Sequence, residues 1–283
     1  MRIGFVGAGL MGAPMVRRLV EAGHEVVVSS RSPERLADTG WTVVGSPAEA
    51  ADGADAVCSI VPDSPEVEGV VRELLEAMAE GSVIIEMSTH SPDAARQLAT
   101  EAAVKGISYL DAPVSGGPSG AAAGTLAIWV GGSAEGFERA WPVLEVLGAT
   151  AKIRHCGEVG AGLVVKLANN YLGAVNAAAS AEVLAMAREE GVDPRLVIDA
   201  VMQGSGANWQ LGNLFPNKVL AGDFEPGFKI EHMTKDVRHE RALAERLGVE
   251  QPVGDVVLGR LTTAMEQYGP DVDYGSVARL LGF

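Results

Sequence analysis

Cysteine is scarce in this chain: only two of its 283 residues are cysteines, Cys58 and Cys156. Neither lies in a paired-ligand spacing, so we expect neither a disulfide framework nor a zinc site, and we expect no other bound metal. Each cysteine lies next to a strand-like segment. Both are therefore predicted to be small, buried hydrophobic residues.

Long apolar runs are also missing. No uninterrupted run approaches the length that crosses a membrane. The chain passes from Met1 directly into a strand pattern, which leaves no room for a signal peptide. We therefore expect a cytoplasmic protein without a membrane partner.

Basic residues are few: 22 lysines and arginines stand against 37 acidic residues, giving a net charge of −15. Affinity for nucleic acid depends on cationic contacts to phosphate, so this balance argues against a nucleic-acid partner. A small anionic ligand stays compatible, since a local pocket needs only a few donors. The length and the 47% hydrophobic content allow two domains with well-buried cores.

The first half of the chain alternates short apolar runs with helix-like segments, such as Leu10–Glu21, Pro65–Ala79 and Pro92–Val104. This alternation predicts βαβ units and a parallel sheet. Ser32, Ser46 and Ser91 each precede a proline and are predicted to cap helices. The apolar runs are Ile3–Val6, Val26–Val28, Ala56–Ile60, Val83–Ile85, Ser108–Leu110 and Leu126–Val130.

The second half reads as helical throughout. Leu163–Glu190 is predicted to form one long helix that Gly191 ends, and its alanine-rich part favours burial. We therefore expect an α/β fold: an N-terminal Rossmann dinucleotide-binding domain (1–160) and a C-terminal all-α domain (161–283), joined by the long helix. An alanine-rich face seldom stays exposed, so we expect a homodimer or homotetramer. The later helices are predicted at Pro194–Met202, His232–Leu247 and Val253–Tyr268.

A glycine-rich turn follows the first strand: Gly7, Ala8, Gly9, Leu10, Met11 and Gly12. Its first glycine permits a tight turn, its second allows the backbone to approach a pyrophosphate, and its third allows close packing of helix on strand. A strand before it and a helix after it are the context that this motif requires. The turn predicts a dinucleotide cofactor bound at the helix N-terminus.

The end of the second strand distinguishes between the dinucleotides. An acid that binds the ribose of NAD belongs there, but this chain has Ser30, Arg31 and Ser32 instead. A 2′-phosphate requires a planar cation and small hydrogen-bonding neighbours, so the segment favours NADP over NAD. The alternative is that Arg31 is a solvated loop residue and Ser32 only a helix cap.

Two further segments contain candidate catalytic and binding residues. The loop Asp111–Gly117 follows a strand, and the amides of Gly116 and Gly117 with the Ser115 hydroxyl fit a substrate carboxylate. The alternative is that Ser115, Gly116 and Gly117 form only a flexible turn. Lys166 and Asn170 are four residues apart in an apolar helix and share one face. A lysine confined beside a cofactor releases its proton more readily and suits acid–base catalysis, whereas the alternative is a surface lysine.

The order of these segments, followed by Lys235-Asp236-Val237, resembles the β-hydroxyacid dehydrogenase family over the whole chain. Members of that family include 3-hydroxyisobutyrate dehydrogenases and tartronate semialdehyde reductases. The resemblance implies hydride transfer between NADP(H) and a small β-hydroxyacid or short-chain semialdehyde. Ser30-Arg31-Ser32 is similar to the Asn-Arg-Thr of NADP-preferring relatives.

The resemblance also implies roles for single residues. Lys166 corresponds to the catalytic lysine, Asn170 to a substrate-side asparagine, and Ser115, Gly116 and Gly117 to the segment that receives the substrate carboxylate. The residues implied near the nicotinamide, its ribose or the substrate are Val61, Pro62, Ser88, Thr89 and Lys235. Trp209 is implied as an apolar wall for the substrate, and the alternative is plain helix packing.

Two alternative functions remain at this point. An imine reductase-like enzyme shares the architecture, but such relatives usually lack the lysine. A non-catalytic dinucleotide-binding module would bind the cofactor without turnover. His232 is interpreted as a structural residue, because a lone histidine is more often part of the packing. His90 lies beside Thr89, close to the expected nicotinamide site, but a catalytic role for it is not favoured.

Overall fold

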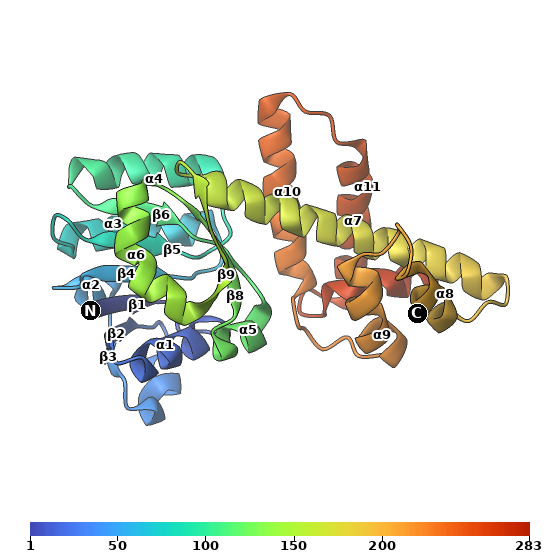
Figure 1. The fold of residues 1–283 in the computed structure, drawn as a ribbon, viewed down its shortest axis with the longest axis horizontal. Helices are drawn as coiled ribbons and strands as arrows, with labels where there is room; N and C mark the ends of the chain where they lie inside the picture. Colours follow the sequence, from blue (N-terminus) through green and yellow to red (C-terminus); the bar gives the residue numbers. More distant parts are fainter. The chain divides into compact units, whose positions relative to one another are not determined.

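The computed structural model describes all 283 residues and divides them into two compact units, Met1–Lys166 and Leu167–Phe283. Figure 1 shows the first unit in blue to green and the second in yellow to red. The division falls a few residues after the expected boundary at residue 160, because the first turn of the long helix packs on the first unit. Leu163 in that turn is fully buried there.

One nine-stranded sheet organises the first unit, in the order β3-β2-β1-β4-β5-β6-β8-β7, with β9 paired to β8. The strands from β1 to β6 are parallel, as predicted. The strands are β1 Arg2–Val6, β2 Glu25–Ser29, β3 Thr42–Val44, β4 Ala56–Ser59, β5 Val83–Glu86, β6 Ser108–Asp111, β7 Val114–Ser115, β8 Leu126–Gly131 and β9 Gly148–Gly157.

The far end of the sheet departs from the prediction. β8 runs antiparallel to β6 and β7, so the sheet is mixed there. Strands β3, β7 and β9 were not predicted from the sequence. β3 and β7 are only three and two residues long, and β9 carries exposed polar side chains that interrupt any apolar run.

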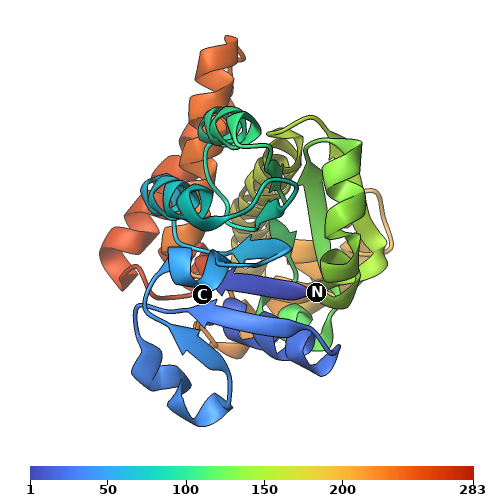
Figure 2. The same cartoon turned by 90° about the vertical axis from the view of Figure 1, so that its left-hand side faces the viewer.

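Helices cover both faces of this sheet. Helices α1, α5 and α6 lie on one face, and α2, α3 and α4 lie on the other. Figure 2 shows α3 and α4 in teal on one side of the strands and α6 in green on the other. The bounds are α1 Gly12–Glu21, η1 Pro33–Thr39, α2 Pro47–Ala51, α3 Ser64–Ala77, α4 Pro92–Val104, α5 Gly117–Ala123 and α6 Ala134–Leu147.

Two of the three predicted helix caps are confirmed. The hydroxyl of Ser46 accepts the amide of Glu49, and that of Ser91 accepts the amide of Ala94. The cap at Ser32 is wrong: η1 is a 3₁₀ turn in which the carbonyl of Ser32, rather than its hydroxyl, accepts the amide of Arg35.

The two cysteines differ in burial. Cys58 is fully buried in β4, as predicted, and burial raises the pKa of its thiol. The prediction of a buried Cys156 is wrong, because that residue is half-buried in β9, the strand with exposed polar side chains.

The second unit is helical, as predicted, with one isolated β-bridge between Lys229 and Asp273. Its main element is α7, Ala161–Glu189, a continuous helix of 29 residues that begins in the first unit. The other elements are α8 Pro194–Val201, η2 Gln210–Leu214, α9 Phe215–Asn217, η3 Val219–Ala221, α10 Ile230–Leu247, α11 Pro252–Tyr268 and η4 Tyr274–Leu281.

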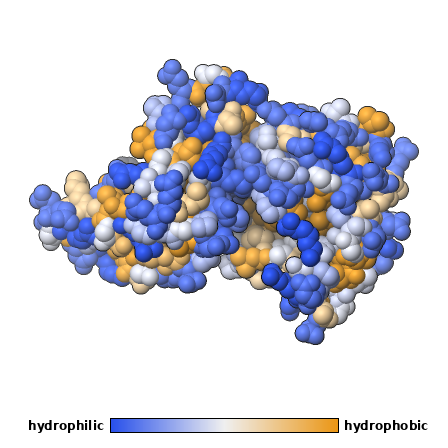
Figure 3. All heavy atoms as spheres, turned by 180° about the vertical axis from the view of Figure 1, so that it is seen from behind, coloured by the Kyte–Doolittle hydropathy of each residue, from blue (hydrophilic) through white to orange (hydrophobic).

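Small side chains line the buried side of α7. Ala174, Ala177 and Ala181 are each 1% exposed within the core of the second unit, so the expected burial is confirmed for this side. Leu172 and Met186 on the same helix are exposed. Figure 3 shows hydrophobic patches among the polar surface of this unit. No helix of the chain combines the length and hydropathy needed to span a membrane.

Candidate functional site

The glycine-rich turn between β1 and α1 requires glycine at two positions. Gly7 has a φ of +96°, and a Cβ there would lie 2.1 Å from the carbonyl oxygen of Ile60. A Cβ at Gly12 would lie 2.1 Å from the carbonyl oxygen of Gly7. Any other residue would force the turn away from β4 or from the first turn of α1. These contacts agree with the tight-turn and close-packing roles expected from the sequence.

The middle of the same turn is open. A Cβ at Gly9 would meet no atom within 4 Å. The amides of Leu10 and Met11 donate to no protein acceptor, and the first turn of α1 carries no acidic residue. Free amides and the positive end of a helix suit an anion that approaches the backbone closely. The turn, including Ala8, therefore fits the pyrophosphate of a dinucleotide.

The segment after β2 presents polar groups and no carboxylate. The Ser32 amide donates to the Ser30 hydroxyl at 3.1 Å, which shapes a short bend around Arg31. The guanidinium of Arg31 is exposed and forms no hydrogen bond or ion pair with the protein. An unpaired, planar cation at this position is suited to a phosphate.

The loops after β4 and β5 are tied together by hydrogen bonds. The Val61 amide donates to the Ser88 hydroxyl at 2.8 Å, and the Ser88 amide donates to Glu86 Oε1 at 2.8 Å. Val61 and Thr89, both half-buried, lie next to these bonds, and Pro62 is exposed. The structure therefore brings together the Val61-Pro62 and Ser88-Thr89 segments that the sequence indicated.

Glu86 is a buried acid that the sequence reasoning missed. Its side chain is fully buried at the end of β5. Desolvation by burial raises the pKa of its carboxyl to about 7, while hydrogen bonds from Ser88 oppose that rise. The available signal was an acid directly after the apolar run Val83–Ile85. A charged residue ending a buried parallel strand requires a partner, and here that partner is the next loop.

The loop after β6 is ordered. Ser115 pairs with Ala127 of β8, and the chain then turns at Gly116 and Gly117, whose φ angles are +137° and +64°. Both values fall in the region that glycine adopts readily and other residues avoid. A Cβ at Gly117 would meet no atom within 4 Å, so its surroundings are open. Ser115 thus ends β7 and Gly117 begins α5, so the segment leads from a strand into a helix.

Lys166 and Asn170 lie on one face of α7, and both side chains are buried, with exposures of 6% and 5%. The alternative of a surface lysine is therefore wrong. Burying an ammonium group is costly unless polar groups or a ligand meet it. Such burial is usual where an amine takes part in binding or proton transfer.

Asp236 organises the polar residues of the second unit. Its Oδ2 accepts the side-chain amide of Asn170 at 2.6 Å, and its Oδ1 lies 2.9 Å from the ammonium of Lys235. Asp236 is 2% exposed, so one buried carboxylate holds two of the predicted site residues. In the sequence, Asp236 appeared only as the residue after Lys235 in a motif, and nothing indicated its contact with Asn170.

The remaining candidates are more peripheral. Trp209, just before η2, has a side chain that is 62% exposed. His90 is fully buried, with Nε2 at 3.4 Å from the Tyr109 hydroxyl. The pKa of His232 is lowered, first by burial and then by the neighbouring charge of Lys235.

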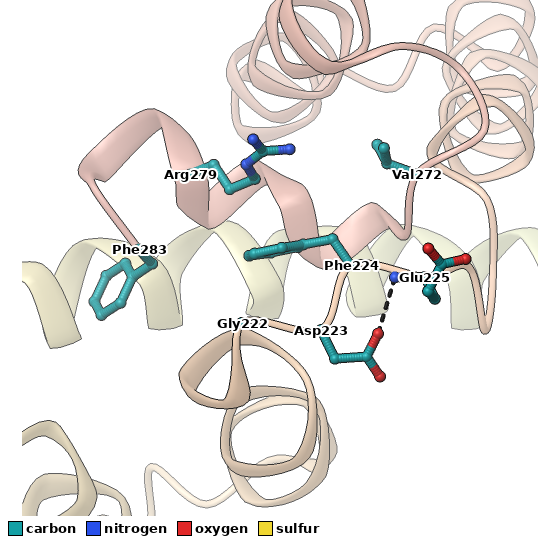
Figure 4. Close-up of a pocket in the computed structure, with 7 residues that line it drawn as sticks. All are labelled: Gly222, Asp223, Phe224, Glu225, Val272, Arg279 and Phe283. Atoms are coloured by element: carbon teal, nitrogen blue, oxygen red, sulfur yellow. Dashed lines mark hydrogen bonds between the residues drawn. The ribbon is translucent and has the colours of Figure 1, made fainter.

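A separate surface hollow of about 590 Å³ lies in the second unit. Figure 4 shows that Arg279 and Phe224 point into it and that the Glu225 amide bonds to Asp223. The Arg279 guanidinium lies 3.9 Å from the ring centre of Tyr268 and is engaged by that contact. None of the predicted site residues lines this hollow.

Comparison with known families covers both units. Residues 2–160 match the model described as the NAD binding domain of 6-phosphogluconate dehydrogenase. Residues 160–281 match the model described as NAD-binding of NADP-dependent 3-hydroxyisobutyrate dehydrogenase. The chain belongs to the β-hydroxyacid dehydrogenase family. The protein is thus an NAD(P)-dependent oxidoreductase of the hydroxyacid dehydrogenase type.

Individual relatives cover this β-hydroxyacid dehydrogenase almost completely. It is 37% identical to the 3-hydroxyisobutyrate dehydrogenase of Pseudomonas aeruginosa, over 98% of this chain and 97% of the relative. It is 35% identical to the NAD-dependent L-serine dehydrogenase of the same organism, over 99% and 97%. The solved structure of Mycobacterium tuberculosis 3-hydroxyisobutyrate dehydrogenase with L-serine shares 34% identity and a TM-score of 0.92, and 99% of each chain is covered.

Proposed function

We propose that this β-hydroxyacid dehydrogenase is an NADP-dependent enzyme that interconverts a small β-hydroxyacid and its semialdehyde, with Lys166 as general acid and base. The observation that carries the proposal is the buried pair Lys166 and Asn170 on one face of α7. An amine buried at 6% exposure in an oxidoreductase of this family is suited to proton transfer.

The chemistry divides between the cofactor and the side chains. A bound nicotinamide dinucleotide supplies or accepts the hydride. In the direction of reduction, the Lys166 ammonium donates a proton to the carbonyl oxygen of the substrate. In the direction of oxidation, the neutral Lys166 amine accepts the hydroxyl proton. Asn170, held by Asp236, orients the substrate oxygen.

The substrate carboxylate is assigned to the loop after β6. The Ser115 hydroxyl and the amides of Gly116 and Gly117 supply neutral donors, and the ordered turn fixes their directions. Lys235 supplies a cation for the substrate or cofactor. Trp209 is available to lie against a substituent of the substrate, since its ring is exposed.

The proposed substrates share one framework. The named relatives act on 3-hydroxyisobutyrate or L-serine, and the solved relative holds L-serine. Both compounds are 3-hydroxypropanoates that differ only in the substituent on the second carbon. A site that grips the carboxylate and the third-carbon oxygen therefore accepts this class, and tartronate and succinic semialdehydes offer related carbonyl and carboxylate groups.

The cofactor preference depends on Arg31. Its exposed guanidinium has no protein partner. The end of β2 has no carboxylate, which would repel a 2′-phosphate. We assign it, with Ser30 and Ser32, to the 2′-phosphate of NADP. A relative of 35% identity is named as NAD-dependent, and a comparison of NADPH with NADH measures the preference directly.

A substrate panel tests the function. Purified protein is assayed with NADPH and NADH against 3-hydroxyisobutyrate-type, tartronate and succinic semialdehydes, and against a cyclic imine. The proposal expects turnover of at least one carboxylate-bearing semialdehyde and a higher kcat/KM with NADPH. Turnover of the imine alone would indicate an imine reductase, and binding without any turnover would indicate a non-catalytic module.

A further inference from the structure

Asp111 contacts a part of the chain far from its own strand. It ends β6 and begins the loop that leads to Ser115, and its side chain is fully buried. Its Oδ1 accepts the amide of Gly160 at 2.7 Å, and its Oδ2 accepts the amide of Leu163 at 2.8 Å. One carboxylate therefore holds the first turn of α7 with both oxygens.

Two glycines permit this close seating. A Cβ at Gly162 would lie 2.2 Å from the carbonyl oxygen of Trp129 and 2.8 Å from that of Asp111. A Cβ at Gly131 would lie 2.4 Å from Asp111 Oδ1 and 2.9 Å from the amide of Ala161. The first turn of α7 thus contacts the backbone of β6 and β8 without intervening side chains. Such backbone contacts are less yielding than contacts through flexible side chains.

We call the contact of the Asp111 carboxylate with the amides of Gly160 and Leu163 the joint. The joint lies close to two proposed functional groups. Lys166 follows Leu163 by three residues, less than one turn of α7 and about 4.5 Å along its axis. On the other side of the joint, Ser115 follows Asp111 by four residues, and the residues from Asp111 to Val114 are buried. Because a helix transmits the placement of its first turn, the same carboxylate fixes the amine-bearing helix and the carboxylate-binding loop.

We propose that Asp111 is a positioning residue that sets the Lys166 amine relative to the Ser115–Gly117 loop. This inference rests on the proposed function, in which Lys166 transfers the proton. A misplacement of about 1 Å between reacting groups can reduce the rate about 100-fold, so loss of the joint reduces kcat. The glycine turn between β1 and α1 binds the cofactor independently of this joint, so cofactor affinity stays unchanged.

The surroundings of Asp111 make the joint sensitive to pH. Glu86 of β5 is paired with Asp111 in the sheet, and the positive charge of Arg96 of α4 lowers the pKa of the Asp111 carboxyl. Burial and the negative charge of Asp111 both raise the pKa of the Tyr109 hydroxyl on β6 and of the Cys156 thiol on β9. Burial raises the pKa of the Asp111 carboxyl to about 6, while the amides of Gly160 and Leu163 lower it. Protonation turns one acceptor oxygen into a donor, and one of the two amides then loses its acceptor.

The variant Asp111→Asn mimics the protonated joint, since its amide nitrogen is unable to accept a hydrogen bond. Ser82→Ala is the matched control: it removes a buried hydroxyl that donates to the carbonyl of Ala79 in the same unit, before the amino end of β5. Each protein is assayed for kcat at saturating substrate and cofactor, for cofactor Kd, and for thermal unfolding.

We expect Asp111→Asn to lower kcat about 10- to 100-fold with cofactor Kd within about twofold of wild type. Ser82→Ala is expected to lose comparable thermal stability and to keep its kcat. The wild-type kcat is expected to fall below about pH 6 with an apparent pKa near that of the Asp111 carboxyl, and this acid limb disappears in Asp111→Asn. Glu86→Gln retains the limb, which separates the two acids.

Three results overturn the proposal. The first is a kcat of Asp111→Asn equal to that of the wild type. The second is a loss of kcat and of cofactor affinity that is proportional to the loss of thermal stability in both variants. The third is a pH profile of the wild-type kcat that has no acid limb near pH 6. The last test needs no variant, so it decides the matter if Asp111→Asn does not fold. Full activity in Lys166→Ala would reject the proposed function itself, whereas an inactive Lys166→Ala with a fully active Asp111→Asn rejects only the positioning role.

Discussion

The side-chain amide of Asn170 donates to Asp236 Oδ2 at 2.6 Å, and the other oxygen of that carboxylate lies 2.9 Å from the Lys235 ammonium. Asn170 belongs to α7, and Asp236 and Lys235 belong to α10. The bond turns the Asn170 amide nitrogen toward Asp236. The carboxylate thereby fixes the orientation of one proposed substrate ligand and the charge environment of another.

Replacement of Asp236 by asparagine is expected to lower kcat/KM for the semialdehyde about 10- to 100-fold. An asparagine there offers one acceptor and one donor, so either the Asn170 amide or the Lys235 ammonium faces a donor. A lost charge-assisted hydrogen bond of this kind costs about 1.5–3 kcal/mol. Asp271→Asn, which removes an exposed carboxylate paired with Lys229, is the control and should leave kcat/KM unchanged. Equal losses in both variants would contradict a specific role for Asp236.

Cofactor preference is expected to change with Arg31. In Arg31→Ala, the Kd for NADPH should rise about 10- to 100-fold, since a charge-assisted contact to the 2′-phosphate is lost. The Kd for NADH should change by less than about threefold. Arg195→Ala, which removes an exposed arginine of α8, controls for net charge. Fluorescence titration of both nucleotides measures these constants, and a parallel weakening of NADH and NADPH would remove the assignment.

The sequence predicted most of the architecture because the relevant signals are local. Alternating apolar runs and helical patterns located strands β1, β2, β4, β5, β6 and β8 and most of the longer helices within a few residues. The glycine turn was also predictable, since Gly7 and Gly12 are required by contacts with immediate sequence neighbours and an adjacent strand. Local patterns of this kind need no knowledge of the tertiary structure.

What the sequence did not predict depends on contacts between distant residues. Asp111 and Asp236 have no spacing rule that marks them, because their partners are the start of α7 and Asn170. Glu86 contacts its neighbour Ser88, but its complete burial depends on the packing around β5. Short or amphipathic strands such as β3 and β9 gain their pairing from the sheet and carry little pattern of their own. Burial of Lys166 is likewise a tertiary property, and the sequence alone left a surface position open as an alternative.

Stability is expected to depend on pH through Glu86. Its folded-state pKa of about 7 lies above the ordinary value of 4.5, so the folded protein binds a proton more tightly than the unfolded chain does. The stabilising contribution of the protonated carboxyl is complete below about pH 4.5 and is lost as the pH rises through 7. The change amounts to about 3 kcal/mol.

Glu86→Gln should therefore flatten the pH dependence of the unfolding free energy between about pH 4.5 and pH 7. Asp111, whose carboxyl pKa is raised to about 6, gives the variant a residual slope that ends near pH 6. Urea unfolding at a series of pH values measures the effect, with the exposed Glu76→Gln of α3 as control. A variant that keeps the wild-type slope above pH 6 would show that another group is responsible.

The most direct test concerns the Lys166 amine. Lys166→Ala is compared with wild type and with Lys152→Ala, which removes an exposed lysine of β9. kcat is followed by the absorbance of the reduced nicotinamide at saturating NADPH and semialdehyde, cofactor Kd is measured separately, and methylamine is added to replace the lost group. The account predicts that Lys166→Ala lowers kcat about 10²- to 10⁴-fold, binds NADPH normally and regains activity with methylamine, while Lys152→Ala behaves as wild type. A Lys166→Ala enzyme that turns over at the wild-type rate would contradict it.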